Sequence, residues 1–156
     1  MLPVRERFAS SRLRASRVAP AARLRYEPGM ENRHQQGPAG PRELVLAWVE
    51  AFNRADPDAL AAFYDEDAVN HQVAEEPVHG REAIREMFRA GFSAAEMTCV
   101  VEQVLEDGEW AALEWRDPNG LRGCGFFHVQ GGRIVFQRGY WDKLSFLRLQ
   151  GLPLPR

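Results

Sequence analysis

The apolar residues of this chain change their spacing near residue 97, from the period of a helix to the period of a strand. The first helical face starts just after Pro41 and follows the i, i+3, i+4, i+7 pattern of one buried stripe: Val45, Trp48, Val49 and Phe52. From residue 97 to residue 105, alternate positions separate into two sets, as they do on the two faces of a strand. Helices followed by strands predict an α+β fold.

Two further helices are predicted before the change of period. Asp56 followed by Pro57 is typical of a helix start, because the Asp side chain can accept a hydrogen bond from the first turn; this predicts a short helix from Asp58 to Tyr64. A short strand or turn is expected over residues 67 to 73. A third helix should follow Gly80, with one apolar side: Ile84, Met87 and Phe88.

Turn-forming residues divide the second half of the chain into strands. The breaks predict four strands of an antiparallel meander, near residues 97 to 105, 109 to 117, 121 to 130 and 133 to 141. Asp142 is expected to cap a closing helix that contains Leu144, Leu147 and Leu149. Three helices packed on one face of such a sheet enclose a space between the two layers.

Charge is distributed unevenly along the chain. Residues 1 to 29 carry seven arginines and two glutamates, a local charge of +5, which leaves −7 on residues 30 to 156 for an overall charge of −2. An acidic body repels nucleic acid and anionic membrane surfaces, so neither is expected as a partner.

Residues 1 to 40 are expected to be a disordered Arg-rich tail or the result of a misplaced upstream start, since Met30 heads a sequence of less biased composition. Their acid-poor composition also resembles a transit peptide superficially. They contain no apolar run of signal-peptide or membrane-span length, so a cytoplasmic location is expected. Cys99 and Cys124 form no CxxC or Cys/His ligand pattern, and no disulfide, metal site or cofactor is predicted.

Two parts of the chain carry a resemblance to a known family. They read ELVLAWVEAFNRADPDALAAFYDEDAVNHQ with GREAIREMF, and EWAALEWRDPNGLRGCGFFHVQGGRIVFQRGYWDKLSFL. Together they resemble the nuclear transport factor 2-like superfamily and, within it, the SnoaL-like proteins, which include polyketide cyclases, ketosteroid isomerases and limonene-epoxide hydrolases. The resemblance implies a SnoaL-like domain over residues 41–156: a cone-shaped, curved antiparallel sheet packed against about three N-terminal helices, with a short C-terminal helix. It also implies a ligand pocket between the layers and pairing through the sheets as a homodimer.

The resemblance to limonene-epoxide hydrolases implies an incomplete catalytic set. That family activates water with two aspartates bridged by an arginine. Asp117 falls on the first aspartate, whereas Trp115 and Gly139 fall on the arginine and the second aspartate. Asn70 and Gln72 take the places of the Tyr and Asn that hold the water. Epoxide hydrolysis by that mechanism is therefore not expected.

The resemblance to ketosteroid isomerases, carried by FYDEDAV and AIRE, implies a second incomplete set. Gln72 lies near the position of the general-base aspartate, and Trp48 replaces the tyrosine that stabilises the oxyanion. An amide cannot abstract a proton, so the family's dienol route is not expected. A difference of one residue before Pro77 leaves open which of Asn70, His71 and Gln72 faces the pocket.

A different set of candidate site residues remains. Strand alternation places Asp117 on the same face as Leu113 and Trp115, and the polyketide cyclases of the resembled family use an Asp and a His. Asp117 and His71 are therefore the candidate catalytic acid and base. The candidate substrate-binding residues are Trp48, Tyr64, Asn70, Gln72, Trp115, Phe127 and Trp141. Asp117 could equally begin the turn at Pro118, a common role for aspartate.

Two classes of function follow from these residues. The first is a cofactor-independent isomerase, cyclase or hydratase-like enzyme that acts on an apolar carbonyl compound. The second is a noncatalytic ligand-binding or dimerisation module. The absence of a second carboxylate favours binding, whereas the inward position predicted for Asp117 favours an enzyme. In both cases the expected partners are a small apolar molecule and a second copy of the chain.

Overall fold

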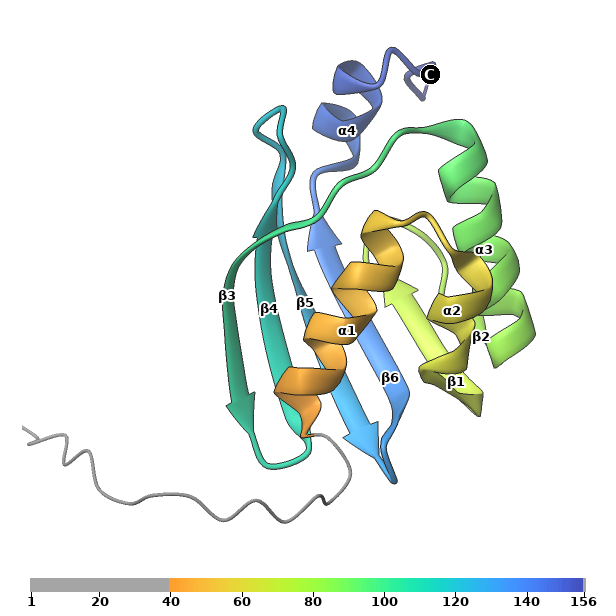
Figure 1. Cartoon of the computed structure of the whole chain (residues 1–156). Helices are drawn as coiled ribbons and strands as arrows, with labels where there is room; N and C mark the ends of the chain where they lie inside the picture. Colours follow the sequence, from red (N-terminus) through yellow and green to blue (C-terminus); the bar gives the residue numbers. More distant parts are fainter. Residues whose placement is uncertain (1–39, 156) are drawn as a thin grey trace, which may run out of the picture. The chain divides into compact units, whose positions relative to one another are not determined.

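The computed structural model describes residues 40–155. The prediction made for residues 1 to 40 lies, apart from Gly40, outside this range. Four helices and six strands follow one another in the described part of the chain (Figure 1): α1 Pro41–Asn53, α2 Pro57–Ala62, β1 Tyr64–Gln72, β2 Val78–His79, α3 Arg81–Ala94, β3 Val100–Asp107, β4 Trp110–Arg116, β5 Arg122–Gln130, β6 Arg133–Trp141 and α4 Lys143–Leu149. Among these helices none has the length and apolar character that crossing a bilayer requires.

The strands form a single sheet in the order β2-β1-β6-β5-β4-β3. Strands β3 to β6 are the predicted antiparallel meander, and β1 pairs with β6 in parallel, so the sheet is mixed. The parallel pair arises because the chain crosses through α3 to the far edge of the sheet and returns to β1 only after four strands. The predicted α+β class, with three helices before the meander and a short closing helix, is confirmed.

The helices cover one face of the sheet (Figure 1). Helix α1 packs on β3, β4 and β5, while α3 packs on β1 and β2 and contacts α2. The predicted stripe of α1 faces the core: Val45, Trp48 and Val49 are buried, and Phe52 is partly buried against them. Stripe burial of this kind is the main source of helix stability in a domain of this size.

Helix α2 is shorter than predicted. Asp56 caps it as expected, accepting a hydrogen bond from the Ala59 backbone N–H over 2.9 Å. The helix ends at Ala62, however, and Tyr64 begins strand β1 instead of ending the helix. Strand β1 therefore also starts earlier than the predicted residue 67. Tyr64 is fully buried and hydrogen-bonded, so its tertiary contacts override the local helical pattern.

The first strand of the meander also differs from the prediction. Strand β3 begins at Val100, and its pairing with β4 shifts between Val101 and Gln103, which leaves Glu102 as the extra residue of a β-bulge. The buried residues Cys99 and Val104 are consequently an odd number of positions apart. The prediction that alternate residues from 97 to 105 form two continuous faces was therefore wrong. The bulge exchanges the inward and outward positions partway along this segment.

The two faces of the sheet are otherwise as predicted for β4. Ala111 and Leu113 are buried toward the helices, whereas Trp110 is 41% exposed on the outer face. On that face Trp110 stacks on His128, with 4.4 Å between ring centroids, and Phe126 packs edge-on against Tyr140. The outer face thus carries a group of partly exposed aromatic rings.

Candidate functional site

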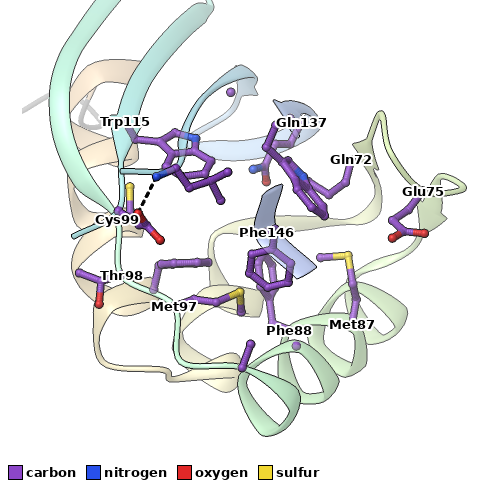
Figure 2. Close-up of a pocket in the computed structure, with 18 of the residues that line it drawn as sticks. Gln72, Glu75, Met87, Phe88, Met97, Thr98, Cys99, Trp115, Gln137 and Phe146 are labelled. Carbon is purple, nitrogen blue, oxygen red and sulfur yellow. Dashed lines mark hydrogen bonds between the residues drawn. The ribbon is translucent and has the colours of Figure 1, made fainter. Parts of the chain in front are cut away.

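A cavity of about 330 Å³ lies between the helices and the inner face of the sheet. Figure 2 shows Trp115, Gln137 and Phe146 turned toward a shared space, with Met87 and Phe88 of α3 on its other side. Most lining side chains are apolar, and seven of them are aromatic: Trp48, Phe52, Phe88, Trp115, Phe127, Trp141 and Phe146. The structure therefore brings four of the five aromatic residues predicted as binding residues to one cavity, all except Tyr64.

A chain of hydrogen-bonded side chains forms the polar base of this cavity. Trp141 donates its indole N–H to Gln72 Oε1 over 3.1 Å, and Gln72 Nε2 donates to Asn70 Oδ1 over 2.8 Å. Asn70 Nδ2 then donates to Gln137 Oε1 over 3.0 Å. Because an indole N–H can only donate, this order determines which end of each amide meets its neighbour. Gln137 is left with Nε2 directed away from the network.

Gln137 is a site residue that the sequence did not indicate. Its side chain is 4% exposed and lines the cavity, and within residues 40–155 its Nε2 has no hydrogen-bond partner. Strand β6 offers no local pattern that singles out a glutamine at this position. The only available signal was its parity, since Gln137 shares a face of β6 with Gly139 and Trp141.

Tyr64 supports the base of the cavity from behind. It accepts the indole N–H of Trp48 over 3.0 Å and an N–H of Asn70 over 3.3 Å, and it donates to Gln137 Oε1. Burial raises the pKa of the Tyr64 hydroxyl, and the hydrogen bonds from Trp48 and Asn70 offset this only in part. Tyr64 and Asn70 were predicted to bind the substrate, but neither is among the residues that line the cavity. They hold Gln137 and Gln72 in place instead.

Glycine at position 139 makes room for Gln72. A Cβ at Gly139 would lie 2.7 Å from Gln72 Cδ and closer still to Oε1. The Gln72 side chain thus occupies the space beside position 139, where the resembled epoxide hydrolases carry their second aspartate. Gln72 lines the cavity, as predicted, through an amide group that can orient a ligand but cannot act as a base.

Glycine at position 123 makes room for Trp115. A Cβ there would lie 2.5 Å from Trp115 Cζ2 and 2.6 Å from the backbone oxygen of Tyr140. The indole of Trp115 therefore packs directly against the backbone of β5 at Gly123, with which Trp115 is paired. This contact holds one wall of the cavity in a fixed position.

Asp117 fulfils both roles that the sequence left open, since it begins a turn and also lines the cavity. Its Oδ1 accepts the backbone N–H groups of Asn119 and Leu121 over 2.9 and 2.8 Å, as in a turn. The residue is also 7% exposed and lines the cavity. Among the described residues no donor contacts its second oxygen, Oδ2. The turn therefore fixes the carboxylate while one oxygen stays available.

His71 does not join Asp117 in the cavity. Asn70 and Gln72 hydrogen-bond to each other through their side chains, so His71 between them lies on the opposite face of β1. It is absent from the residues that line the cavity. The predicted acid/base pair of Asp117 and His71 is therefore not formed, because strand alternation directs the two side chains to different faces.

Cys99 lies in the cavity wall, in the segment that joins α3 to β3. Its backbone N–H donates to Asn53 Oδ1 over 2.7 Å, and Asn53 Nδ2 donates to the Cys99 carbonyl over 2.9 Å, which ties this segment to α1. Burial raises the pKa of the Cys99 thiol to about 12. In the part of the chain described, no group of three His, Cys, Asp or Glu side chains is arranged to hold a metal ion.

Helix α4 closes one side of the cavity. Asp142 caps it, as predicted, by accepting a hydrogen bond from the Ser145 backbone N–H over 2.5 Å. Phe146 packs edge-on against Trp141, with 5.4 Å between ring centroids, and Gln150 Nε2 donates to the Glu96 carbonyl over 2.8 Å. These contacts place Phe146 over the aromatic wall. The sequence predicted the helix but not that it contributes to the cavity.

Several solved structures have a fold similar to that of this chain. No curated protein matches it. A protein of ketosteroid isomerase-like fold from Catenulispora acidiphila, solved in complex with trimethylamine, is 19% identical with a TM-score of 0.64; the match covers 74% of this chain and 96% of that one. An epoxide hydrolase of M. tuberculosis similar to limonene-epoxide hydrolases is 20% identical, with a TM-score of 0.60 and coverage of 70% and 88%.

A third solved structure is the epoxide hydrolase/cyclase-like enzyme SalBIII, which acts in pyran ring formation in salinomycin. It is 24% identical with a TM-score of 0.58, and the match covers 67% of this chain and 92% of that one. At this level of identity the three structures establish the fold alone. The family model of the SnoaL-like domain matches residues 45–137, which is more than half of the chain. The chain therefore belongs to the SnoaL-like domain family.

Proposed function

We propose that this protein binds one small, largely apolar carbonyl compound in the cavity between its helices and its sheet. The observation that carries the proposal is Gln137 Nε2, an amide donor at the base of a largely apolar cavity, which has no hydrogen-bond partner within residues 40–155. Apolar walls supply affinity by burial, and a single donor at the base orients a ligand oxygen. An acceptor atom of a ligand in the cavity would give this donor its hydrogen-bond partner.

The binding test uses tryptophan fluorescence. Three of the four tryptophans line the cavity, so the Trp110→Phe variant restricts the emission to those three. The ketone 2-decalone and its hydrocarbon decalin are titrated into this variant, and saturable quenching by both is expected, with tighter binding of the ketone. Gln137→Met should weaken binding of 2-decalone but not of decalin. Absence of saturable binding by either compound would refute the proposal.

A second function is favoured by the unpaired Oδ2 of Asp117. A carboxylate held by two backbone N–H groups in an apolar cavity could act as a single general base toward a carbon next to the ligand carbonyl, which is the first step of an isomerase or cyclase. Gln137 Nε2 would then stabilise the developing oxyanion. His71 has no part in this scheme.

Proton abstraction can be tested without knowledge of the natural substrate. 2-Decalone is incubated with the protein in D₂O, and exchange of the hydrogens next to the carbonyl is followed by NMR. The wild-type protein should accelerate this exchange, Asp117→Asn should abolish the acceleration, and His71→Gln should leave it unchanged. Binding of 2-decalone without accelerated exchange would support a noncatalytic binding module.

We also propose that the protein forms a homodimer through the outer face of its sheet. The aromatic side chains Trp110, Phe126 and Tyr140 are each exposed by about two fifths on that face, which is unusual for a fully solvated surface. Light scattering of the full chain should give twice the chain mass, and Trp110→Glu should give the mass of one chain. A wild-type protein that stays monomeric at high concentration would contradict this assembly.

A further inference from the structure

We propose that the cavity recognises a positive charge, so that its ligand is an apolar amine or a quaternary ammonium compound. This inference rests on the proposed binding function and names the chemical class of the ligand. It follows from the charges around the cavity, from the unpaired oxygen of Asp117 and from the aromatic walls. A carbonyl oxygen on the same ligand remains compatible with the donor at Gln137.

The charged residues that line the cavity all have the same sign. Four carboxylates line it, and no Lys, Arg or His is among the lining residues in the part of the chain described: Glu75, Glu76, Glu96 and Asp117 are the acids. Three of these lie at the exposed rim, and only Glu75 has a cationic partner there, Lys143, at 2.6 Å. A concave site lined by one sign of charge attracts the opposite charge and repels its own. Anionic ligands are therefore disfavoured.

Asp117 is the most deeply buried of the four carboxylates. Its side chain is largely buried, and Oδ2 has no partner within residues 40–155. The arginines nearest in sequence do not neutralise it, because Arg116 and Arg122 lie on the outer face of the sheet and pair there with Glu102. A carboxylate oxygen that borders an aromatic cavity and accepts no hydrogen bond there can contact a positive charge directly. Residues 40–155 place no cation among the residues that line the cavity, so a cationic ligand would supply one.

The walls favour the same class of ligand. Trp48, Trp115 and Trp141 all line the cavity, and the face of an indole ring is the strongest aromatic partner for a cation. The N–H groups of Trp48 and Trp141 are already donated to Tyr64 and Gln72, so the contribution of these two rings to a ligand is apolar and π-type contact. An ammonium group surrounded by alkyl carbon matches such walls without requiring further hydrogen bonds.

The test compares two probes of nearly equal shape, one cationic and one neutral, with a smaller anionic probe. Benzyltrimethylammonium is the cation, neopentylbenzene replaces its nitrogen by carbon, and phenylacetate is the anion. Each is titrated into the full-length Trp110→Phe protein by tryptophan fluorescence. We expect the cation to bind about tenfold more tightly than neopentylbenzene, which corresponds to about 1.4 kcal/mol, and phenylacetate to bind most weakly.

Variants separate the effect of the cavity carboxylate from that of net charge. Asp117→Asn keeps an acceptor for the Asn119 and Leu121 N–H groups, so the fold should be retained. It should lower the affinity for benzyltrimethylammonium about tenfold and leave that for neopentylbenzene unchanged. Glu50→Gln removes the same charge from an exposed position on α1 and should change neither. If Asp117→Asn does not fold, Glu96→Gln at the rim should give a smaller loss for the cation alone.

The possible results distinguish this inference from the binding proposal. Neutral probes that bind as tightly as the cation would overturn the inference while leaving the binding proposal intact. An equal loss of cation affinity in Glu50→Gln and Asp117→Asn would also overturn it, since net charge would then explain the preference. Failure of benzyltrimethylammonium, neopentylbenzene and 2-decalone to bind at all would overturn both.

Discussion

Removal of the Tyr64 hydroxyl should destabilise this protein far more than removal of a hydroxyl from its surface. In Tyr64→Phe, the ring keeps its fully buried position, and only the oxygen that joins Trp48, Asn70 and Gln137 is lost. Asn70 Nδ2 and Gln137 Oε1 still hydrogen-bond to each other over 3.0 Å. The indole N–H of Trp48 loses its acceptor and becomes a buried donor without a partner.

The magnitude follows from that single orphaned donor. A buried donor left without a partner costs about 1–3 kcal/mol, and the loss of the desolvated hydroxyl itself offsets a fraction of this. We therefore expect the free energy of unfolding to fall by about 1–2 kcal/mol. Tyr140 is the matched control, because its side chain is 41% exposed and its hydroxyl makes no hydrogen bond within residues 40–155. Tyr140→Phe should change the free energy of unfolding by no more than about 0.5 kcal/mol.

The assay is urea unfolding of the three proteins, followed by far-UV circular dichroism. The midpoint should fall for Tyr64→Phe while the slope of free energy against urea stays constant, since the buried area is nearly unchanged. Tryptophan emission should also change in Tyr64→Phe, because Trp48 loses its acceptor. Equal stability of Tyr64→Phe and Tyr140→Phe would refute the hydrogen-bond network at the base of the cavity.

Three further perturbations test the site. Gly139→Ala should displace the Gln72 amide from Asn70 and Trp141, lowering the free energy of unfolding by about 1–2 kcal/mol and altering tryptophan emission; unchanged emission and stability would contradict the packing of Gln72. Burial raises the pKa of Tyr64 and brings that of Cys99 to about 12. Both groups therefore lose their protons more readily in the unfolded state, so a rise in pH favours unfolding. Urea midpoints should therefore stay level below about pH 9 and fall above it, and a level profile through that range would contradict the burial of both groups. A thiol reagent followed by mass spectrometry should modify the half-buried Cys124 before Cys99, whose thiolate is scarce; faster modification of Cys99 would be the contrary result.

Features that depend only on neighbouring residues could be predicted from the amino-acid sequence. The apolar stripe of α1, the caps at Asp56 and Asp142 and the inward face of β4 are encoded within a few positions of the chain. Their physics is local, because a helical stripe, a cap or a strand face needs only a period or one side chain. The family resemblance rests on the same segments, and it predicted the layered α+β fold and the position of the cavity.

The arrangement of the site, in contrast, depends on contacts between residues that are distant in the sequence. The hydrogen bond from Asn70 to Gln137 joins residues 67 positions apart, and that from Trp141 to Gln72 joins residues 69 positions apart. No local pattern specifies such contacts, because they depend on the parallel pairing of β1 with β6. The same pairing sets the register that directs Asn70 and Gln72 inward and His71 outward, which the sequence left open. The polar groups of the cavity are therefore a property of strand register, and periodicity along one strand cannot reveal the register between two.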